Sequence, residues 1–200
     1  MVDSKVDGED FKGFGPVLNE LIRARRTLQV FTPAPNDPEL IERALELALW
    51  APNHRLTFPW RFVVVEDSTR QRLADLALEL KRAESSQKLS KAQELAIRNK
   101  ILEPAALVGL GCLKNADPLV ERENYASVAC GVQNISLYLW SQGWGSKWGT
   151  GALTRQPQVY ELFNWNPDQV EIVGFLWAGP YDRSPRVPER PSLDQFLARV

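Results

Sequence analysis

The feature of this sequence that most limits its fold is a long stretch without a charged residue, which runs from Asn124 to Ser146. The dipeptide Asp117-Pro118 before it is a strong helix start, because aspartate caps a helix N-terminus and proline suits the first turn. The stretch is long enough to span a membrane, but its polar side chains argue against that. They belong to Asn124, Ser127, Gln133, Asn134, Ser136, Ser141 and Gln142. We therefore expect a helix through Trp140 that is buried on nearly all sides in a soluble protein.

The composition of the 200-residue chain excludes several classes of protein. Lysine plus arginine number 24 and aspartate plus glutamate 25, so the net charge is −1 and a nucleic-acid partner is not expected. One histidine and two distant cysteines are too few for a histidine-rich or all-cysteine metal site. The segment from Met1 to Asp10 is polar and lacks the apolar region of a signal peptide. We expect a cytoplasmic protein with no metal and no membrane segment.

Periodicity and breakers predict an interleaved order of helices and strands in one domain over 15–200, after a mobile leader over 1–14. Helices are expected over 16–26, 38–50, 68–81, 118–140 and 154–163, and strands over 61–66, 104–113, 144–148 and 169–178. Residues 82–93 are polar and are expected to form an exposed helical or disordered excursion. From about 180 to 200 the chain is expected to form an extended arm with a last helical turn. Because the connections lack a regular βαβ rhythm, we favour the α+β class.

Several common catalytic motifs are absent from the sequence. No Gly-x-Gly-x-x-Gly turn joins a strand to a helix, and there is no P-loop and no Gly-x-Ser-x-Gly elbow. The segment from Gly143 to Gly149 resembles a nucleotide loop, but it follows a helix and has the wrong spacing. No side chain is therefore marked out as a catalytic nucleophile, acid or base.

Three segments remain as candidates for ligand binding. Arg25-Arg26-Thr27 offers two guanidiniums and a hydroxyl, which suit a phosphate, although cations are also common at a solvated helix C-terminus. Ala51-Pro52-Asn53-His54 places the one histidine in a loop before a strand, either as a ligand donor or as an ordinary surface residue. The glycines and tryptophans from Gly143 to Leu153 suit either a flat ligand or a strand with flexible ends.

These segments, taken in order along the chain, resemble the flavin-dependent nitroreductase family, in its small one-domain subgroup. The resemblance extends from about Leu18 to about Pro180. It is carried by Arg25-Arg26-Thr27, Ala51–His54 with Pro59-Trp60, Gly131–Leu137 with Gln142–Gly145, Trp148–Leu153 and Ile172–Leu176. The family usually has Arg-Arg-Ser where this chain has Arg25-Arg26-Thr27. A relative would offer Arg-Ser at Gly149-Thr150, so one phosphate or substrate contact is expected to differ.

The resemblance implies a homodimer with a central mixed sheet flanked by helices, a long buried core helix, and FMN at each of two subunit-interface sites. It implies that Arg25, Arg26 and Thr27 hold the phosphate and ribityl chain. His54 and Trp50 would lie near the flavin. Trp148, Gly149 and Thr150 would contact the ring or ribityl chain. An arginine of the tail would compensate for the missing contact; the sequence leaves Arg183, Arg186 and Arg190 open, and we select Arg190 as the candidate. The stretch linked to the nicotinamide nucleotide matches Tyr138, Leu139, Trp140, Ser141, Gln142 and Gly143.

The function implied is a ping-pong oxidoreductase that takes hydride from NAD(P)H and reduces nitroaromatics, quinones or similar electron-poor acceptors. The redox chemistry would belong to the flavin N5 atom, while the protein positions the reactants. Two alternatives stay open at this point. One is a different flavin reaction on the same fold, such as dehalogenation or flavin breakdown, and the other is a non-enzymatic flavin-binding protein. Halide release or flavin breakdown would favour the first, and bound FMN without turnover the second.

The uncharged helix also gives a physical argument for a dimer. Its small residues are Ala126, Ser127, Ala129, Cys130 and Gly131, and they permit close helix packing. A domain of this size seldom needs a helix buried on every side unless another subunit covers it. The sequence therefore predicts that Gly131→Leu weakens dimerisation and flavin retention together.

Overall fold

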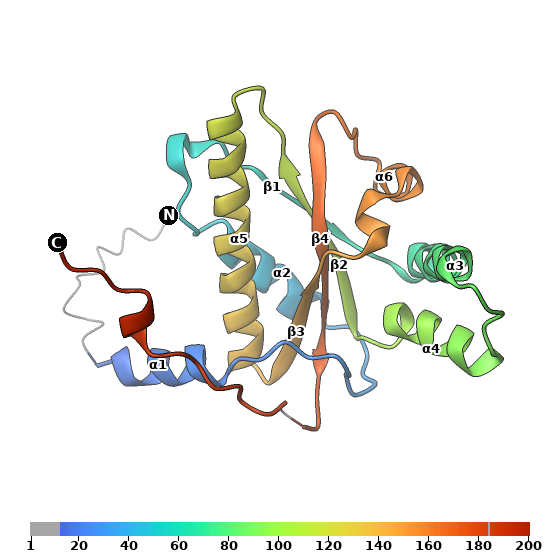
Figure 1. Ribbon diagram of the computed structural model, residues 1–200, viewed down its shortest axis with the longest axis horizontal. Helices are drawn as coiled ribbons and strands as arrows, with labels where there is room; N and C mark the ends of the chain where they lie inside the picture. Colours follow the sequence, from blue (N-terminus) through green and yellow to red (C-terminus); the bar gives the residue numbers. More distant parts are fainter. Residues whose placement is uncertain (1–12, 184) are drawn as a thin grey trace.

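The centre of the computed structural model, which describes residues 13–183 and 185–200, is a four-stranded sheet. Most of the expected leader, residues 1–12, lies outside the described part. The strands are β1 (Trp60–Val64), β2 (Ala106–Leu113), β3 (Trp144–Gly149) and β4 (Val170–Pro180). The helices are α1 (Gly15–Ala24), α2 (Pro38–Ala48), α3 (Asp67–Glu84), α4 (Lys91–Leu102), α5 (Pro118–Ser141) and α6 (Pro157–Phe163). Figure 1 shows helices on both sides of the sheet, which confirms the α+β class.

The strand order is β1-β2-β4-β3, and all three strand pairs are antiparallel. The expectation of a mixed sheet is therefore corrected, because the four strands form an antiparallel sheet. Within the described residues, parallel pairing is limited to one bridge, between Thr27 and Ser146. The reason is that the segment after α1 runs along the outer edge of β3 in the same direction as β3, but pairs with it at a single position. That segment covers an edge that would otherwise be open for pairing.

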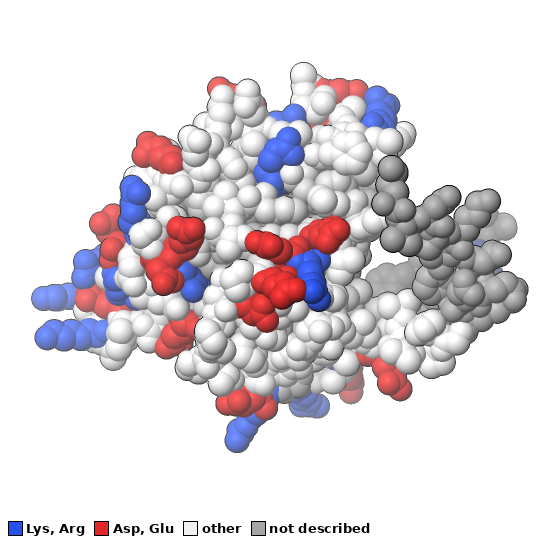
Figure 2. Space-filling view, turned by 180° about the vertical axis from the view of Figure 1, so that it is seen from behind, with Lys and Arg blue, Asp and Glu red and all other residues white. Residues whose placement is uncertain are grey.

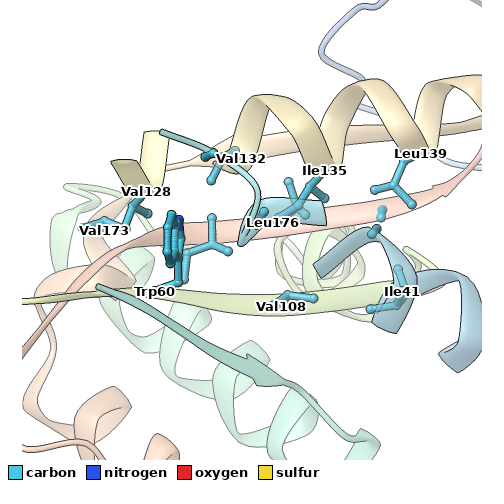
Figure 3. Close-up of a cluster of buried hydrophobic side chains, with 14 of the residues drawn as sticks. Ile41, Trp60, Val108, Val128, Val132, Ile135, Leu139, Val173 and Leu176 are labelled. Carbon is cyan, nitrogen blue, oxygen red and sulfur yellow. The ribbon is translucent and has the colours of Figure 1, made fainter. Parts of the chain in front are cut away.

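Two apolar clusters hold the helices to the sheet. On one face, α2 and α5 pack on the strands through a cluster that includes Trp60, Val108, Ile135 and Leu139, drawn in Figure 3. On the other face, α3, α4 and α6 enclose a second cluster around Leu73, Phe163 and Phe175. The apolar residues of α2 that the periodicity places toward the core are buried at Ile41, Ala44 and Ala48 and half-buried at Leu40 and Leu45.

The helix starts predicted from Asp-Pro pairs are confirmed. The Asp37 carboxylate accepts a hydrogen bond from the Leu40 amide at 3.0 Å, and the Asp117 carboxylate accepts one from the Leu119 amide at 2.9 Å. The helix expected over 154–163 is instead interrupted at Gln156-Pro157. It forms a short 3₁₀ turn, Ala152–Arg155, followed by α6, because proline disfavours a helical residue before it.

The helix α4 is absent from the sequence prediction, which had only a polar excursion over 82–93. The structure extends α3 to Glu84 and begins α4 with a capping box, in which the Ser90 hydroxyl accepts from the Gln93 amide and Gln93 reaches back to Ser90. Arg82 then pairs with Glu94 across the two helices. The Ser-x-x-Gln pattern is the signal that would have located this helix.

The long helix α5 is buried on one side rather than on nearly all sides, so that expectation is wrong for a single chain. Its inner side includes Ser127, Gly131 and Leu139, which are buried. Its outer side carries an exposed row at helical spacing, which we call the outer stripe and define as Arg122, Ala126, Cys130 and Gln133. None of the helices described is both long and apolar enough to cross a membrane.

The outer surface carries charges of both signs. Figure 2, which views the molecule from behind, shows acidic and basic side chains interspersed between large uncharged areas. On the face shown, this distribution is in line with the net charge of −1.

Candidate functional site

Three arginines gather where α1 ends. Arg25 follows the last turn of α1, Arg26 comes next, and Arg190 approaches from the C-terminal arm. The Nε atoms of Arg25 and Arg26 are both buried without a hydrogen-bond partner. Burial lowers the pKa of Arg25, and the charges of Arg26 and Arg190 lower it further. Within the described residues, no ion pair joins any of the three to a carboxylate.

This arginine cluster is suited to a multiply charged anion. Three like charges held close together are unfavourable by themselves, and two buried donors without acceptors add a desolvation cost. An anionic group with several oxygens offsets both, since guanidiniums bind phosphate through paired, charge-assisted hydrogen bonds. The residues present therefore fit a phosphate ester, and the structure brings Arg190 to the pair that the sequence indicated.

The segment after the arginines lies against β3. Besides the bridge from Thr27 to Ser146, the Leu28 amide donates to the Ser146 carbonyl at 3.1 Å. The Lys147 ammonium donates to the Gln29 side-chain oxygen at 2.8 Å. Thr27 is exposed, so its hydroxyl is free to face a ligand, while the neighbouring Leu28 is buried and anchors the segment.

A cavity of about 880 Å³ opens beside this segment, between β3 and the helices α3 and α4. We call it the lysine cavity, because Lys81, Lys100 and Lys147 line it together with Gln29, Phe31 and Trp177. Its volume lies at the upper end of the range for small-molecule sites, about 300–1,000 Å³. Gln29 lines the lysine cavity and belongs to the segment that follows Arg25 and Arg26. A molecule that carries both an anionic group and a flat ring therefore fits with the anionic group at the arginines and the ring in the adjacent cavity.

Trp148 and Thr150 both lie beside Tyr125, whereas Gly149 between them faces the other side of the strand. The Trp148 indole N–H donates to the Val173 carbonyl at 3.1 Å on the α5 side of the sheet. Gly149 faces the lysine cavity side, where a Cβ atom would stand 2.6 Å from the Trp177 ring. Thr150 is exposed and lines a separate cavity of about 360 Å³ with Tyr125. Strand alternation causes this division, because successive side chains point to opposite faces.

The loop with His54 lies at the opposite end of α5 from the arginine cluster. His54 Nδ1 is 3.1 Å from the Glu123 carboxylate in the first part of α5, and its side chain is 65% exposed. Trp50 follows α2 and is 79% exposed. In Figure 1, α1 lies at the C-terminal end of α5 and the His54 loop lies at its N-terminal end. With about 1.5 Å per helical residue, the 24 residues of α5 span roughly 36 Å, so one chain does not bring these candidates together.

The His54 loop is held in a strained conformation. Arg55, Leu56 and Phe58 all have positive φ, at 61°, 49° and 47°, which is uncommon for residues other than glycine. Asn53 holds the loop by donating to Thr57 and Ser127, and Thr57 donates to Asn124 at 2.6 Å. Strained residues persist where the surroundings fix them, often at functional sites.

The turn over Tyr138–Gly143 ends α5 beside β3. The Trp140 ring stacks on Tyr181 with centroids 4.9 Å apart. The Ser141 hydroxyl donates to the Tyr138 carbonyl, and Gly143 has the positive φ of 76° that a helix end favours. Leu139 is the exception in this set, because its side chain is fully buried in the core and presents no group to a nucleotide. It supports the turn from inside.

The candidate residues indicated by the sequence do not include Gln29, Lys100, Lys147 or Trp177. They come from four separate elements and meet only around the lysine cavity. None of these residues belongs to a motif. Lys147 stands out in the sequence as a charge within an otherwise uncharged strand, but the sequence does not show which residues lie next to Lys147 in space. Within the described residues there is no group of three or more side chains suited to a metal ion.

Comparisons with known proteins show the family and the fold of the chain. YfhC of Bacillus subtilis, named as a candidate NAD(P)H nitroreductase, is 27% identical over 183 residues, which cover 90% of this chain and 93% of YfhC. A crystal structure of a nitroreductase-like family protein from Bacillus cereus matches with a TM-score of 0.80 and 25% identity, over 92% and 95% of the two chains. An FMN complex of a candidate nitroreductase from Desulfovibrio desulfuricans matches in fold with a TM-score of 0.70 and 19% identity, over 92% and 96%. The model of the nitroreductase family matches residues 22–179, and the chain therefore belongs to that family.

Proposed function

We propose that this protein is an FMN-dependent oxidoreductase that takes hydride from NAD(P)H and passes it to a small electron-poor acceptor such as a nitroaromatic or a quinone. The observation that carries the proposal is the cluster of Arg25, Arg26 and Arg190, with two buried guanidinium atoms that lack partners, next to a cavity large enough for a ring. The names of the B. subtilis relative and of the D. desulfuricans structure support the same cosubstrate and cofactor.

The residues have distinct roles in this proposal. The three arginines and the Thr27 hydroxyl hold the phosphate and ribityl chain, and the backbone around Gly149 and Thr150 supports the ring. When bound, the flavin supplies hydride transfer, and no protein side chain acts as a nucleophile. The proposed contacts for the nicotinamide nucleotide are the exposed residues Ser141, Gln142 and Gly143 and the half-buried Tyr138 and Trp140.

We also propose that two chains form the functional unit. Within the outer stripe of α5, Ala126 and Cys130 are small and uncharged, and Trp50, Leu56 and Phe58 are large apolar residues left exposed nearby. If two α5 helices pack antiparallel about a twofold axis, the His54 loop of each chain reaches the arginine end of the other. The separation of these candidates along α5 within one chain is thereby removed, and each site combines residues of both subunits. Cys112 and Cys130 are unpaired, which suits a reducing cytoplasm.

Substitution of Ala126 by glutamate tests the dimer. Because Ala126 lies on the exposed outer stripe, the variant chain is expected to fold normally but to elute as a monomer with about tenfold weaker FMN retention. Light scattering gives the mass and circular dichroism confirms the fold. Leu95→Glu on α4, also exposed, is the control that should remain dimeric. A dimer with full flavin in Ala126→Glu would contradict the proposed interface.

The activity itself is tested by the colour and turnover of the purified protein. We expect bound flavin, visible as a yellow absorption band, and oxidation of NADH or NADPH that depends on an added nitroaromatic or quinone. A colourless protein that takes up no added FMN would rule out the proposal. Bound FMN without turnover on several acceptors would favour a flavin-binding protein instead.

A further inference from the structure

The loop that carries His54 is tied to α5 by side-chain hydrogen bonds on either side of the histidine. Asn53 donates to Ser127 at 3.2 Å, and Thr57 donates to Asn124 at 2.6 Å. Three residues of this loop have positive φ, and such a conformation persists only where the surroundings fix it. The position of the His54 ring is therefore set by the fold, although its side chain is exposed.

A carboxylate of α5 orients the ring. Nδ1 of His54 lies 3.1 Å from Oε1 of Glu123. An ionised carboxylate only accepts hydrogen bonds, so Nδ1 carries its hydrogen in both the neutral and the protonated ring. The second oxygen of Glu123, Oε2, is buried without a hydrogen bond and lies 4.0 Å from Nε of Arg55. Within the described residues, His54 and Arg55 are the side chains at ion-pair distance from this carboxylate.

The other ring nitrogen of His54 is available to a ligand. Over residues 13–183 and 185–200, no hydrogen bond engages Nε2. Because the carboxylate retains the hydrogen on Nδ1, Nε2 is the atom that gains and loses a proton. An aspartate orients the histidine of serine hydrolases in the same way. A ring held like this can give a proton to a ligand and take one back from water.

The proposed reaction needs such a proton. A quinone becomes a hydroquinone by gaining a hydride and a proton, and in the proposed function NAD(P)H supplies the hydride. The sequence marks out no acid for the proton. In the proposed dimer, the His54 loop of one chain reaches the arginine end of the other, where the acceptor binds, so Nε2 is the ring atom directed at that site.

We propose that His54 donates a proton to the acceptor bound at the site of the second subunit, and that Glu123 is the residue that positions it. The inference rests on the proposed function, since it names the proton source of the same reaction. With a quinone, one oxygen receives the hydride and the other receives the proton from Nε2. The Nε2–H bond breaks and leaves its electron pair on the nitrogen, so the ring becomes neutral and keeps its hydrogen on Nδ1. Water then returns a proton to Nε2.

The positioning role is tested on the purified dimer by nitrogen NMR. The chain contains one histidine, so the signals of a 15N-histidine-labelled sample belong to His54 alone. At a pH where the ring is neutral, we expect mainly Nδ1–H in the unmodified protein. Glu123→Gln is expected to shift the ring to mainly Nε2–H, because a glutamine amide can donate to Nδ1. Glu20→Gln on α1, an exposed carboxylate at the other end of α5, is the control that should leave the tautomer unchanged.

The proton role is tested by comparing two acceptors. A quinone takes up protons as it is reduced, whereas ferricyanide takes up electrons alone. A positioned acid contributes roughly 10²–10⁴-fold, and Glu123→Gln leaves the acid present but misplaced. We therefore expect the ratio of quinone turnover to ferricyanide turnover to fall about tenfold in this variant. His54→Gln should lower the ratio at least as far, and Glu20→Gln should keep it.

Four outcomes would contradict the inference. An Nε2–H ring in the unmodified protein would show that Glu123 does not set the tautomer. Equal losses with quinone and ferricyanide would place the effect of Glu123→Gln on the flavin or the fold. A switched tautomer with an unchanged ratio would show that His54 gives no proton. Absence of flavin or of NAD(P)H oxidation with either acceptor would sink the proposed function and the proton step with it, while the NMR measurement, which needs no turnover, would still report whether Glu123 positions the ring.

Discussion

Replacing Gly131 by leucine is expected to lower the free energy of unfolding by about 3 kcal/mol, because the site has no room for a side chain. A Cβ atom at this position would stand 2.7 Å from the Trp60 indole nitrogen and 3.1 Å from both the Cβ and the carbonyl oxygen of Ala48. The indole now donates to the Ser127 carbonyl at 3.2 Å, and a leucine would displace it. Urea denaturation followed by circular dichroism measures the loss.

Gly15→Leu is the matched control, because a Cβ atom there meets nothing within 4 Å. A Gly131→Leu chain as stable as the unmodified protein would contradict the close contact of α5 with α2 and β1. The contacts of Gly131 with Trp60 and Ala48 of its own chain replace the expectation from the sequence that Gly131 lies in a dimer interface. Gly131 and Ser127 face the interior of their own chain, whereas Ala126 and Cys130 face outward. Loss of flavin in Gly131→Leu would therefore follow from unfolding.

The double substitution of Arg25 and Arg26 by methionine is expected to weaken FMN binding by about 100-fold or more. Hydrogen bonds to charged groups contribute about 1.5–3 kcal/mol each, which is roughly a factor of 10 to 100 per arginine. Quenching of flavin fluorescence in the apo-protein measures the affinity. Riboflavin, which lacks the phosphate, should bind equally weakly to the variant and to the unmodified protein. A large loss for riboflavin as well would place the effect on the ring rather than on the phosphate.

The same variant is expected to keep or gain stability without ligand. The pKa of Arg25 is lowered in the folded chain, so folding disfavours its charged form at every pH where the arginine is protonated. Removing both charges takes away the repulsion between Arg25 and Arg26 and the repulsion of Arg25 by Arg190. Arg23→Met, an exposed residue of α1 that donates to Asn19, is the control for FMN affinity. A destabilised apo-protein would show that the arginines hold the fold together instead of awaiting an anion.

The start of each Asp-Pro helix could be predicted from sequence because capping depends on a few adjacent residues. Asp37 and Asp117 place their carboxylates at the helix ends within two or three residues. The capping box of Ser90 and Gln93 also depends on adjacent residues and could have predicted the start of α4. The polar composition of the surrounding segment favoured the prediction of an exposed excursion instead. Family membership was also accessible, because its motifs are short local segments such as Arg25-Arg26-Thr27.

The face that each residue of α5 presents could not be predicted in the same way. An uncharged helix gives no polar side to orient it, so Ser127 and Ala126 were equivalent in the sequence. The contacts of Gly131 with Trp60 and Ala48 resolve this, since they join residues more than 70 positions apart. Likewise, the sequence pointed to a tail arginine but only the path of the arm brings Arg190 to Arg25.

The sequence by itself determined the α+β class, the helix starts at 37–38 and 117–118, and the segments that mark the family, because these depend on local spacing and capping. The tertiary structure decided which side of α5 is buried, which lysines meet at the cavity, and that His54 and the arginines lie at opposite ends of one helix. The physical reason is that burial, charge repulsion and unpaired donors arise only between residues distant in the sequence. No local pattern encodes those pairings, so only the packed chain reveals them.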